Sequence, residues 1–219
     1  VMDVWKILLG HAPLIGTFIP ADAIPQSWEQ IVLQVRFPRV VLALLVGACL
    51  SVAGAGFQGV LRNPLADPFT LGVASGASVG AAFLILFGMQ YAFLGQWTVP
   101  VIAFCTGMAT LLVVFRLARV QGKYRVETVI LSGVVVQAFL GSAVSFMVSL
   151  SDDVVNQILF WLMGSLAMRG WLHSAVLAPY LIGGFLLMMA YGRTLNLFLL
   201  GEQHAAHLGV NVERTKWLV

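Results

Sequence analysis

The feature that most constrains this chain is a series of long apolar runs without charged residues. They cover residues 40–61, 68–115, 128–150 and 173–192, and the stretch "GMQYAFLGQWTVP" (88–100) divides the longest of them in two. A helix needs about 20 mainly apolar residues to cross the hydrocarbon core of a bilayer. Only 10% of the residues are charged, whereas soluble domains carry about 25%. The sequence therefore predicts an all-α, polytopic membrane helical bundle with five spans.

A sixth apolar piece, "VVNQILFWLMGSLAM" (154–168), is too short for a comfortable crossing. It also contains Asn156 and Gln157, whose amides are costly to place in lipid. We expect an interfacial or re-entrant helix here and do not count it as a span.

The Lys and Arg residues lie mostly on one side of the predicted spans. That side holds Arg62, Arg116, Arg119, Lys123, Arg125, Arg193, Arg214 and Lys216, and the other holds Lys6, Arg36, Arg39 and Arg169. Because Lys and Arg concentrate on the cytoplasmic side of membrane proteins, the first side is predicted to be cytoplasmic and residues 1–39 to be external.

The two ends of the chain look like cuts through a larger protein. No spanning run precedes the external segment, and "VERTKWLV" resembles the charged entry to a further helix. We interpret residues 1–219 as a single permease-like domain that is incomplete at both ends. Residues 1–39 form its external segment, residues 40–192 its five spans, and residues 193–219 a cytoplasmic loop and the start of the next span.

Small residues recur every four positions in three of the predicted spans. They are Gly47, Ser51, Ala55 and Gly59 in the first, Gly72, Gly76 and Gly80 in the second, and Gly133, Gln137, Gly141 and Ser145 in the fourth. Helices in lipid associate through close backbone approach along such ridges, which predicts a compact bundle. Gln137 must find a polar partner in mid-span, either in a neighbouring helix or in a water-filled path.

The sequence contains none of the catalytic or nucleotide-binding motifs that a membrane enzyme or an ATPase would need. Neither Ser75-Gly76 nor Ser132-Gly133 is preceded by Gly-x as an intramembrane serine hydrolase requires, and no Glu follows His204 to make a zinc motif with His207. No phosphate-binding loop is present either. We therefore predict no catalytic residue, metal or cofactor, and any ATP hydrolysis would reside in a partner subunit.

Several motifs resemble one family closely. They are "RFPRVVLALLVGACLSVAGAGFQGVLRNPLADPFTLGVASGASVGAAF" (36–83), "ETVILSGVVVQAFLGS" (127–142), "QILFWLMGSL" (157–166) and "LGEQHAAHLGVNVERTK" (200–216). Together they resemble the FecCD-type permease subunits of ABC importers for iron-siderophores, haem and cobalamin. The resemblance covers nearly the whole chain.

The resemblance implies a ten-span permease, of which this chain would supply the second to sixth spans. It also implies a homodimer in the cell (inner) membrane, cytoplasmic ATP-binding subunits, an external substrate-binding protein and a metal-chelate substrate, with no nucleic-acid partner. A secondary transporter of a small solute is the alternative. Such a transporter usually places an ionisable group near mid-membrane, and the five predicted spans contain none.

By the same resemblance, the polar stretch after the last span would be a coupling helix that enters a cleft of the ATPase. The residues matched to that role are Gly201, Glu202, Ala205, Ala206, Leu208 and Gly209. Their chemistry suits a short rigid helix, since Glu202 favours its first turn and Gly209 can take the left-handed position that closes it. Ala205 and Ala206 would allow close approach of a partner. The alternative is a merely solvated turn.

The resemblance also implies that Arg36 and Arg39 dock carboxylates of the binding protein. Pro38 between them could begin the span at its first turn and give them a defined helix start. The alternative is that both arginines anchor to lipid headgroups. Ser132 and Gln137 are the candidates for lining the translocation pathway, and for Gln137 a purely structural role stays open.

Overall fold

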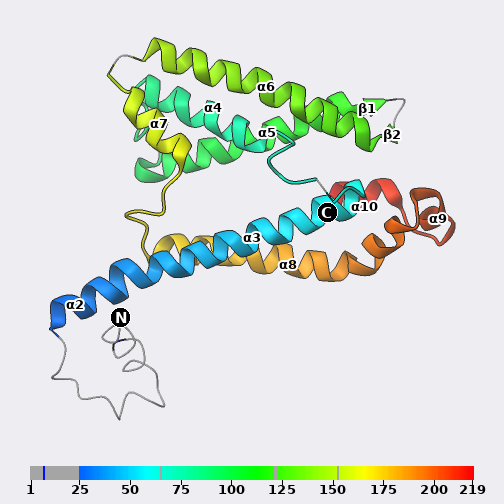
Figure 1. Ribbon diagram of the computed structural model, residues 1–219, viewed down its shortest axis with the longest axis horizontal. Helices are drawn as coiled ribbons and strands as arrows, with labels where there is room; N and C mark the ends of the chain where they lie inside the picture. Colours follow the sequence, from blue (N-terminus) through cyan, green and yellow to red (C-terminus); the bar gives the residue numbers. More distant parts are fainter. Residues whose placement is uncertain (1–6, 8–24, 65, 121–122, 152) are drawn as a thin grey trace. The chain divides into compact units, whose positions relative to one another are not determined.

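The computed structural model describes residue 7 and residues 25–64, 66–120, 123–151 and 153–219 (Figure 1). Its helices are α2 (Gln26–Ile31), the π-helical turn η3 (Val32–Arg36), α3 (Phe37–Leu61), α4 (Val73–Leu86), the 3-10 turn η4 (Gly95–Trp97), α5 (Thr98–Ala118), α6 (Val126–Leu150), α7 (Val155–Met163), α8 (Trp171–Leu199), α9 (Glu202–His207) and α10 (Val212–Leu218). Between α5 and α6 lie two strands of two residues each, β1 (Arg119–Val120) and β2 (Lys123–Tyr124), which pair in antiparallel fashion. Apart from this short pair the regular structure of the described residues is helical, which confirms the predicted all-α class.

Among the described residues, four helices are long and apolar enough to cross a membrane: the continuous helix Gln26–Leu61, the segment Gly95–Ala118, α6 and α8. The second of the five predicted spans is shorter than expected, because α4 contains only 14 residues. Residues 68–72 were expected to begin this span but form a turn. Asp67 Oδ1 accepts the Thr70 N–H at 2.7 Å, and Gly72 has a left-handed φ of 76°. The predicted short helix at 154–168 is present as the nine-residue α7.

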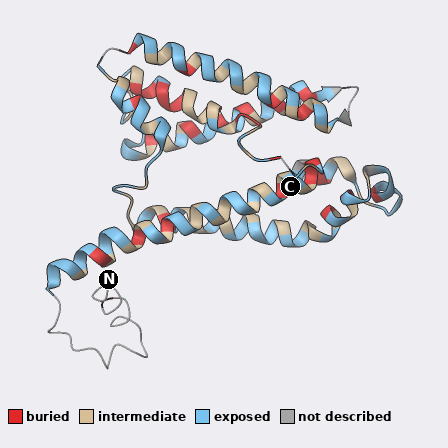
Figure 2. Cartoon of the chain, viewed as in Figure 1, coloured by how far each residue is buried: buried red, intermediate tan, exposed pale blue. Residues whose placement is uncertain are grey.

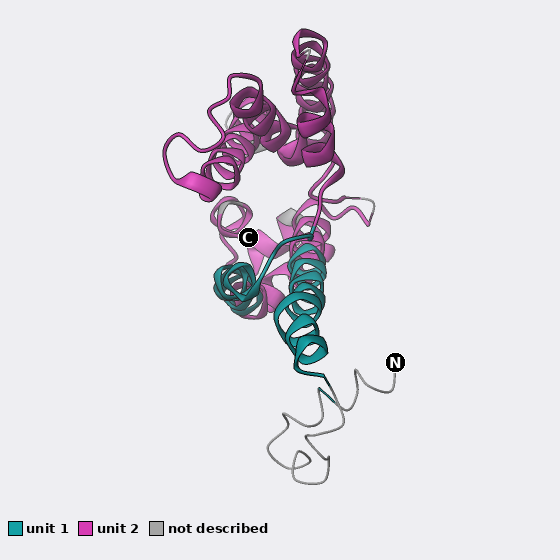
Figure 3. Cartoon of the chain, turned by 90° about the vertical axis from the view of Figure 1, so that its left-hand side faces the viewer, with its two compact units in different colours: residues 1–52, 166–186 teal, residues 53–165, 187–219 magenta. Residues whose placement is uncertain are grey.

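The chain falls into two compact units, residues 1–52 with 166–186 and residues 53–165 with 187–219, and the boundary crosses both α3 and α8 (Figure 3). In the second unit, α4, α5 and α6 pack against one another, and α7 packs against α4. Figure 2 shows buried residues along α4, α5 and α6. The main core of this unit includes Leu71, Val114, Val129 and Phe198.

Glycines set the close packing of α4 against α5 and α6. A Cβ atom at Gly76 would overlap the Thr110 hydroxyl, and one at Gly80 would overlap the Thr106 hydroxyl. Gly133 of α6 lies directly on the backbone that precedes α4, because its Cβ would be 2.5 Å from the Thr70 carbonyl oxygen. These contacts confirm that small residues mediate helix approach here, as expected for packing in lipid.

Other small residues of these ridges have no neighbouring helix against them in the described part of the chain. A Cβ at Gly47 of α3 or at Gly141 of α6 would meet nothing within 4 Å among the residues described. Gly59 is intermediate, since its Cβ would touch Leu195 of α8 at 3.4 Å. The recurring small residues therefore correctly predict close helix packing for α4 and its neighbours. They do not predict it for every helix in which they recur.

Candidate functional site

The predicted coupling segment forms a short helix held between two glycines. Gly201 has φ 107° and ψ 147°, a conformation that is open essentially only to glycine, and its carbonyl accepts the Ala205 N–H at 3.0 Å. The chain thus turns sharply between the end of α8 and the start of α9. The side chain of Glu202 lies outside the described part of the chain.

Gly209 closes α9 in the left-handed conformation that the sequence predicts, with a φ of 85°. The Val210 N–H donates to the Ala205 carbonyl and the Gly209 N–H to the Ala206 carbonyl, both at 3.0 Å. This pair of bonds is the Schellman motif, which satisfies the last carbonyls of a helix. The result is a compact helical knob with a fixed exit.

The structure corrects the expectation that Ala205 offers a surface for partner approach. Ala205 is fully buried in the core that also contains Phe198 and Leu195. It therefore anchors α9 to the rest of the second unit. Ala206 and Leu208 are exposed instead, Leu208 by 64%, and Leu200 just before the knob is exposed to the same extent. These three residues contribute accessible apolar surface at the knob.

The segment after the knob begins with a side-chain helix cap. Asn211 caps α10, because its Oδ1 accepts the Arg214 N–H at 3.0 Å and its carbonyl accepts the Thr215 hydroxyl at 3.0 Å. A helix is thus present where the sequence predicts one, at Val212–Leu218, and its role as the start of a further span stays a prediction. The cap fixes the direction in which the chain leaves the knob.

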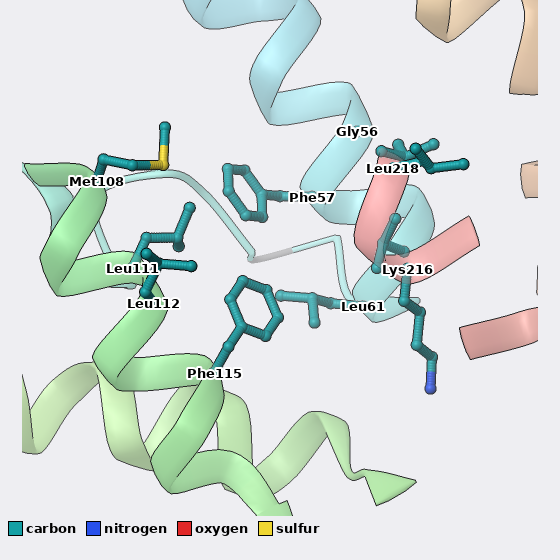
Figure 4. Close-up of a pocket in the computed structure, with 11 residues that line it drawn as sticks. Gly56, Phe57, Leu61, Met108, Leu111, Leu112, Phe115, Lys216 and Leu218 are labelled. Carbon is teal, nitrogen blue, oxygen red and sulfur yellow. The ribbon is translucent and has the colours of Figure 1, made fainter. Parts of the chain in front are cut away.

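A cavity of about 280 Å³ lies beside α10 and is shown in Figure 4. Its walls are mostly apolar side chains of α3, α5 and α10, among them Phe57, Leu111 and Phe115. Figure 4 shows the amine of Lys216 directed away from these side chains. Binding sites for polar ligands carry a few convergent polar groups, and the cavity walls do not present such a set within the described chain.

The two candidate docking arginines do not lie at a helix start. The helix begins at Gln26, continues through the π-turn η3 and passes Pro38 without a break, so the prediction that Pro38 opens the span is wrong. A π-turn widens the helix just where proline cannot donate a hydrogen bond, which lets the chain continue. Arg36 is exposed, whereas Arg39 is half-buried with its Nε lacking a hydrogen-bond partner in the part of the chain described. Most of the predicted external segment, residues 1–6 and 8–24, lies outside the described residues.

Sequence reasoning missed a contact beside these arginines. The indole N–H of Trp171, the first residue of α8, donates to the Leu33 carbonyl of η3 at 3.2 Å. The Trp171 ring also meets the Phe37 ring edge-on, with centroids 5.6 Å apart. Pro38 marks a missing backbone donor, but no local pattern links it to a tryptophan 133 positions later.

The two pathway candidates lie on different sides of α6. Gln137 packs with its backbone against Gly72, whose Cβ would be 3.5 Å from the Gln137 Cα. Residues five apart on an α-helix are separated by about 140° around the axis, so Ser132 points in another direction. Both are half-buried. The structure does not bring them together as one lining.

The FecCD transport family matches residues 1–219, and the chain belongs to this family. It is 37% identical over 202 residues to the cobalamin import system permease protein BtuC of Halobacterium salinarum, covering 90% of this chain and 52% of that protein. It is 36% identical over 197 residues to the hemin transport system permease protein HmuU of Yersinia pestis, covering 89% of this chain and 58% of that protein. The chain thus spans about half the length of the curated relatives it matches.

One solved structure has the same fold over nearly the whole chain. It is described as an inward-facing conformation of a metal-chelate type ABC transporter, and it matches with a TM-score of 0.76 at 30% sequence identity. The match covers 99% of this chain and 67% of that one. Family and fold therefore agree with the resemblance that the motifs indicate.

Proposed function

We propose that this chain is part of the membrane permease of an ATP-driven importer that carries a metal chelate, of the iron-siderophore, haem or cobalamin class, into the cytoplasm. The family supports this proposal, and the observation that carries it is the knob formed by α9. Two glycines in conformations costly for other residues fix this helix, while Ala206 and Leu208 stay exposed. A rigid projection with an exposed apolar surface suits insertion into a partner that moves.

The partners follow from the same proposal. The knob would engage a cytoplasmic ATP-binding subunit, Arg36 and Arg39 would receive an external substrate-binding protein, and a second permease copy would complete the route through the inner membrane. The distribution of Lys and Arg supports this orientation, with the knob on the side that carries eight of the twelve positive charges.

The direct test uses the full-length permease reconstituted in vesicles with its ATPase and binding protein. Mass spectrometry of the ligand retained by the binding protein would identify the chelate to supply outside. We expect uptake to require ATP on the side of the membrane where the ATPase is bound. Uptake should stop when the ATPase is inactivated. Uptake driven by an ion gradient without ATP would contradict the proposal and favour the secondary transporter.

Reversing both docking charges, Arg36→Glu with Arg39→Glu, should weaken docking of the binding protein by about tenfold or more, because like charges then face its carboxylates. The effect should shrink at high salt, and Glu→Arg changes on the binding protein should restore part of the affinity. Gln30→Glu on α2 is the matched control, since it adds an exposed negative charge to the same helix without removing an arginine. Normal docking by the double variant would leave only the lipid-anchor interpretation.

A cysteine at Gln137, in a chain without Cys49 and Cys105, tests the pathway role. If Gln137 lines the route, a small thiol reagent should label the cysteine to different extents in the resting and ATP-bound importer. Its contact with Gly72 provides the competing explanation, namely packing alone. A cysteine at exposed Phe139 is the control for reagent access from lipid. Absence of labelling at position 137 in every state would favour packing.

A further inference from the structure

Pro38 removes one backbone donor from the continuous helix Gln26–Leu61. In η3 the Phe37 N–H donates to the Val32 carbonyl, five residues back. The next bond of this series would run from residue 38 to the Leu33 carbonyl. Residue 38 is proline, which has no N–H to give. The Leu33 carbonyl therefore lacks the donor that the next bond of this series would give it.

Trp171, 138 residues after Leu33, supplies a donor to this carbonyl. Its indole N–H reaches the Leu33 carbonyl, and its ring packs edge-on against Phe37. Pro38, which causes the gap, is fully buried. Trp171 thus contacts the residues on both sides of Arg36 and begins α8 at the same point, so it joins the first turn of α8 to the π-turn.

We propose that Trp171 is a positioning residue for the docking of the external binding protein, acting by holding the π-turn that contains Arg36 and leads into the first turn of α3 with Arg39. This inference rests on the proposed docking role of the two arginines. A long charged side chain on a loose turn pays conformational entropy when it forms an ion pair, and a fixed turn reduces that cost. Trp171 carries no charge, so it would influence docking only through the backbone that it fixes.

A further basic side chain lies close to Trp171 in the sequence. Arg169 precedes Trp171 by two residues, and its Nη1 lies 3.3 Å from His173 Nε2. In the turn before α8, Met168 has a left-handed φ of 57°. A partner surface bearing carboxylates fits this composition. Lipid anchoring by Trp171 is the competing role, because tryptophan is common at membrane interfaces, but lipid anchoring does not require the bond to Leu33.

The experiment uses the complete importer and its isolated binding protein, with Trp171→Phe as the test variant. Phenylalanine keeps an aromatic ring against Phe37 and removes the indole N–H, together with one of the two fused rings. Trp28→Phe on α2 is the matched control, because Trp28 is exposed by 56%, close to the 48% of Trp171. We expect Trp171→Phe to weaken docking by roughly threefold to tenfold, the range for loss of one hydrogen bond, and Trp28→Phe to leave it unchanged.

A double-mutant cycle separates positioning from an independent effect. If Trp171 acts through the arginines, Trp171→Phe should change docking little once Arg36→Glu and Arg39→Glu are present. An additive effect, or unchanged docking by Trp171→Phe alone, would overturn the proposal. If the arginine variant docks normally, the docking role itself fails and the Trp171 proposal falls with it, whereas ATP-driven uptake can still be measured separately.

A second measurement needs no partner. Amide hydrogen exchange over residues 30–38 should be several-fold faster in Trp171→Phe than in the parent or in Trp28→Phe, because the π-turn opens more readily without its external donor. Unchanged protection of this segment would overturn the inference even if docking were weaker.

Discussion

Replacing Gly133 by Ala is expected to destabilise the permease strongly, although it adds a single methyl group. The new Cβ would lie 2.5 Å from the Thr70 carbonyl oxygen and 3.0 Å from the Leu71 Cα. Both are backbone atoms, so no side-chain rotation relieves the overlap. The turn is also tied down, because the Thr70 N–H and hydroxyl both bond to Asp67. α6 must then move away from the turn before α4.

We expect a loss of roughly 3 kcal/mol in the free energy of unfolding, at the upper end of the cost of overpacking. Thermal unfolding of the purified full-length permease in detergent measures this loss. Gly141→Ala is the control on the same helix, where the new Cβ meets nothing within 4 Å. It should be neutral or slightly stabilising, as alanine is the better helix former. Equal stability of the two variants would contradict the packing described for Gly133.

Replacing Gly209 by Val should abolish most transport while leaving the amount of permease in the membrane unchanged. A β-branched residue at φ 85° costs on the order of 1–3 kcal/mol, and the Schellman bonds from Val210 and Gly209 would be lost with it. The knob would no longer end at a fixed angle. Uptake into vesicles, and stimulation of ATP hydrolysis by the binding protein, should both fall about tenfold or more for a loss of this size.

Two further variants make this result specific. Gly88→Val introduces the same substitution at a left-handed glycine, φ 67°, in the turn after α4, and transport should stay near normal. Ala206→Trp leaves the glycines intact and enlarges an exposed side chain of the knob. It should block partner contact without disturbing the core, unlike Ala205→Trp, which would overfill a buried position. Normal coupled transport by both Gly209→Val and Ala206→Trp would rule out α9 as the coupling element.

Some features of the candidate coupling site could be predicted from the sequence, and others could not. The left-handed turn at Gly209 follows from a glycine that ends a short polar helix, a local rule that the structure confirms. The burial of Ala205 does not follow from any local rule, since it depends on Phe198 and Leu195 being folded next to it. Its chemistry, a small apolar side chain, suits a buried and an exposed position equally well.

The sequence by itself determined that the chain is a helical membrane protein of this family, where four of its long apolar helices lie and which glycine closes the knob. These properties depend on runs of apolar residues and on single backbone positions, which act over a few turns of chain. Only the tertiary structure decided that α4 stops at 14 residues, that Gly133 and not Gly141 meets a neighbour, and that Trp171 supplies the bond Pro38 cannot make. Each of these depends on atoms that are far apart in the sequence, and no periodicity records which of several similar residues will face them.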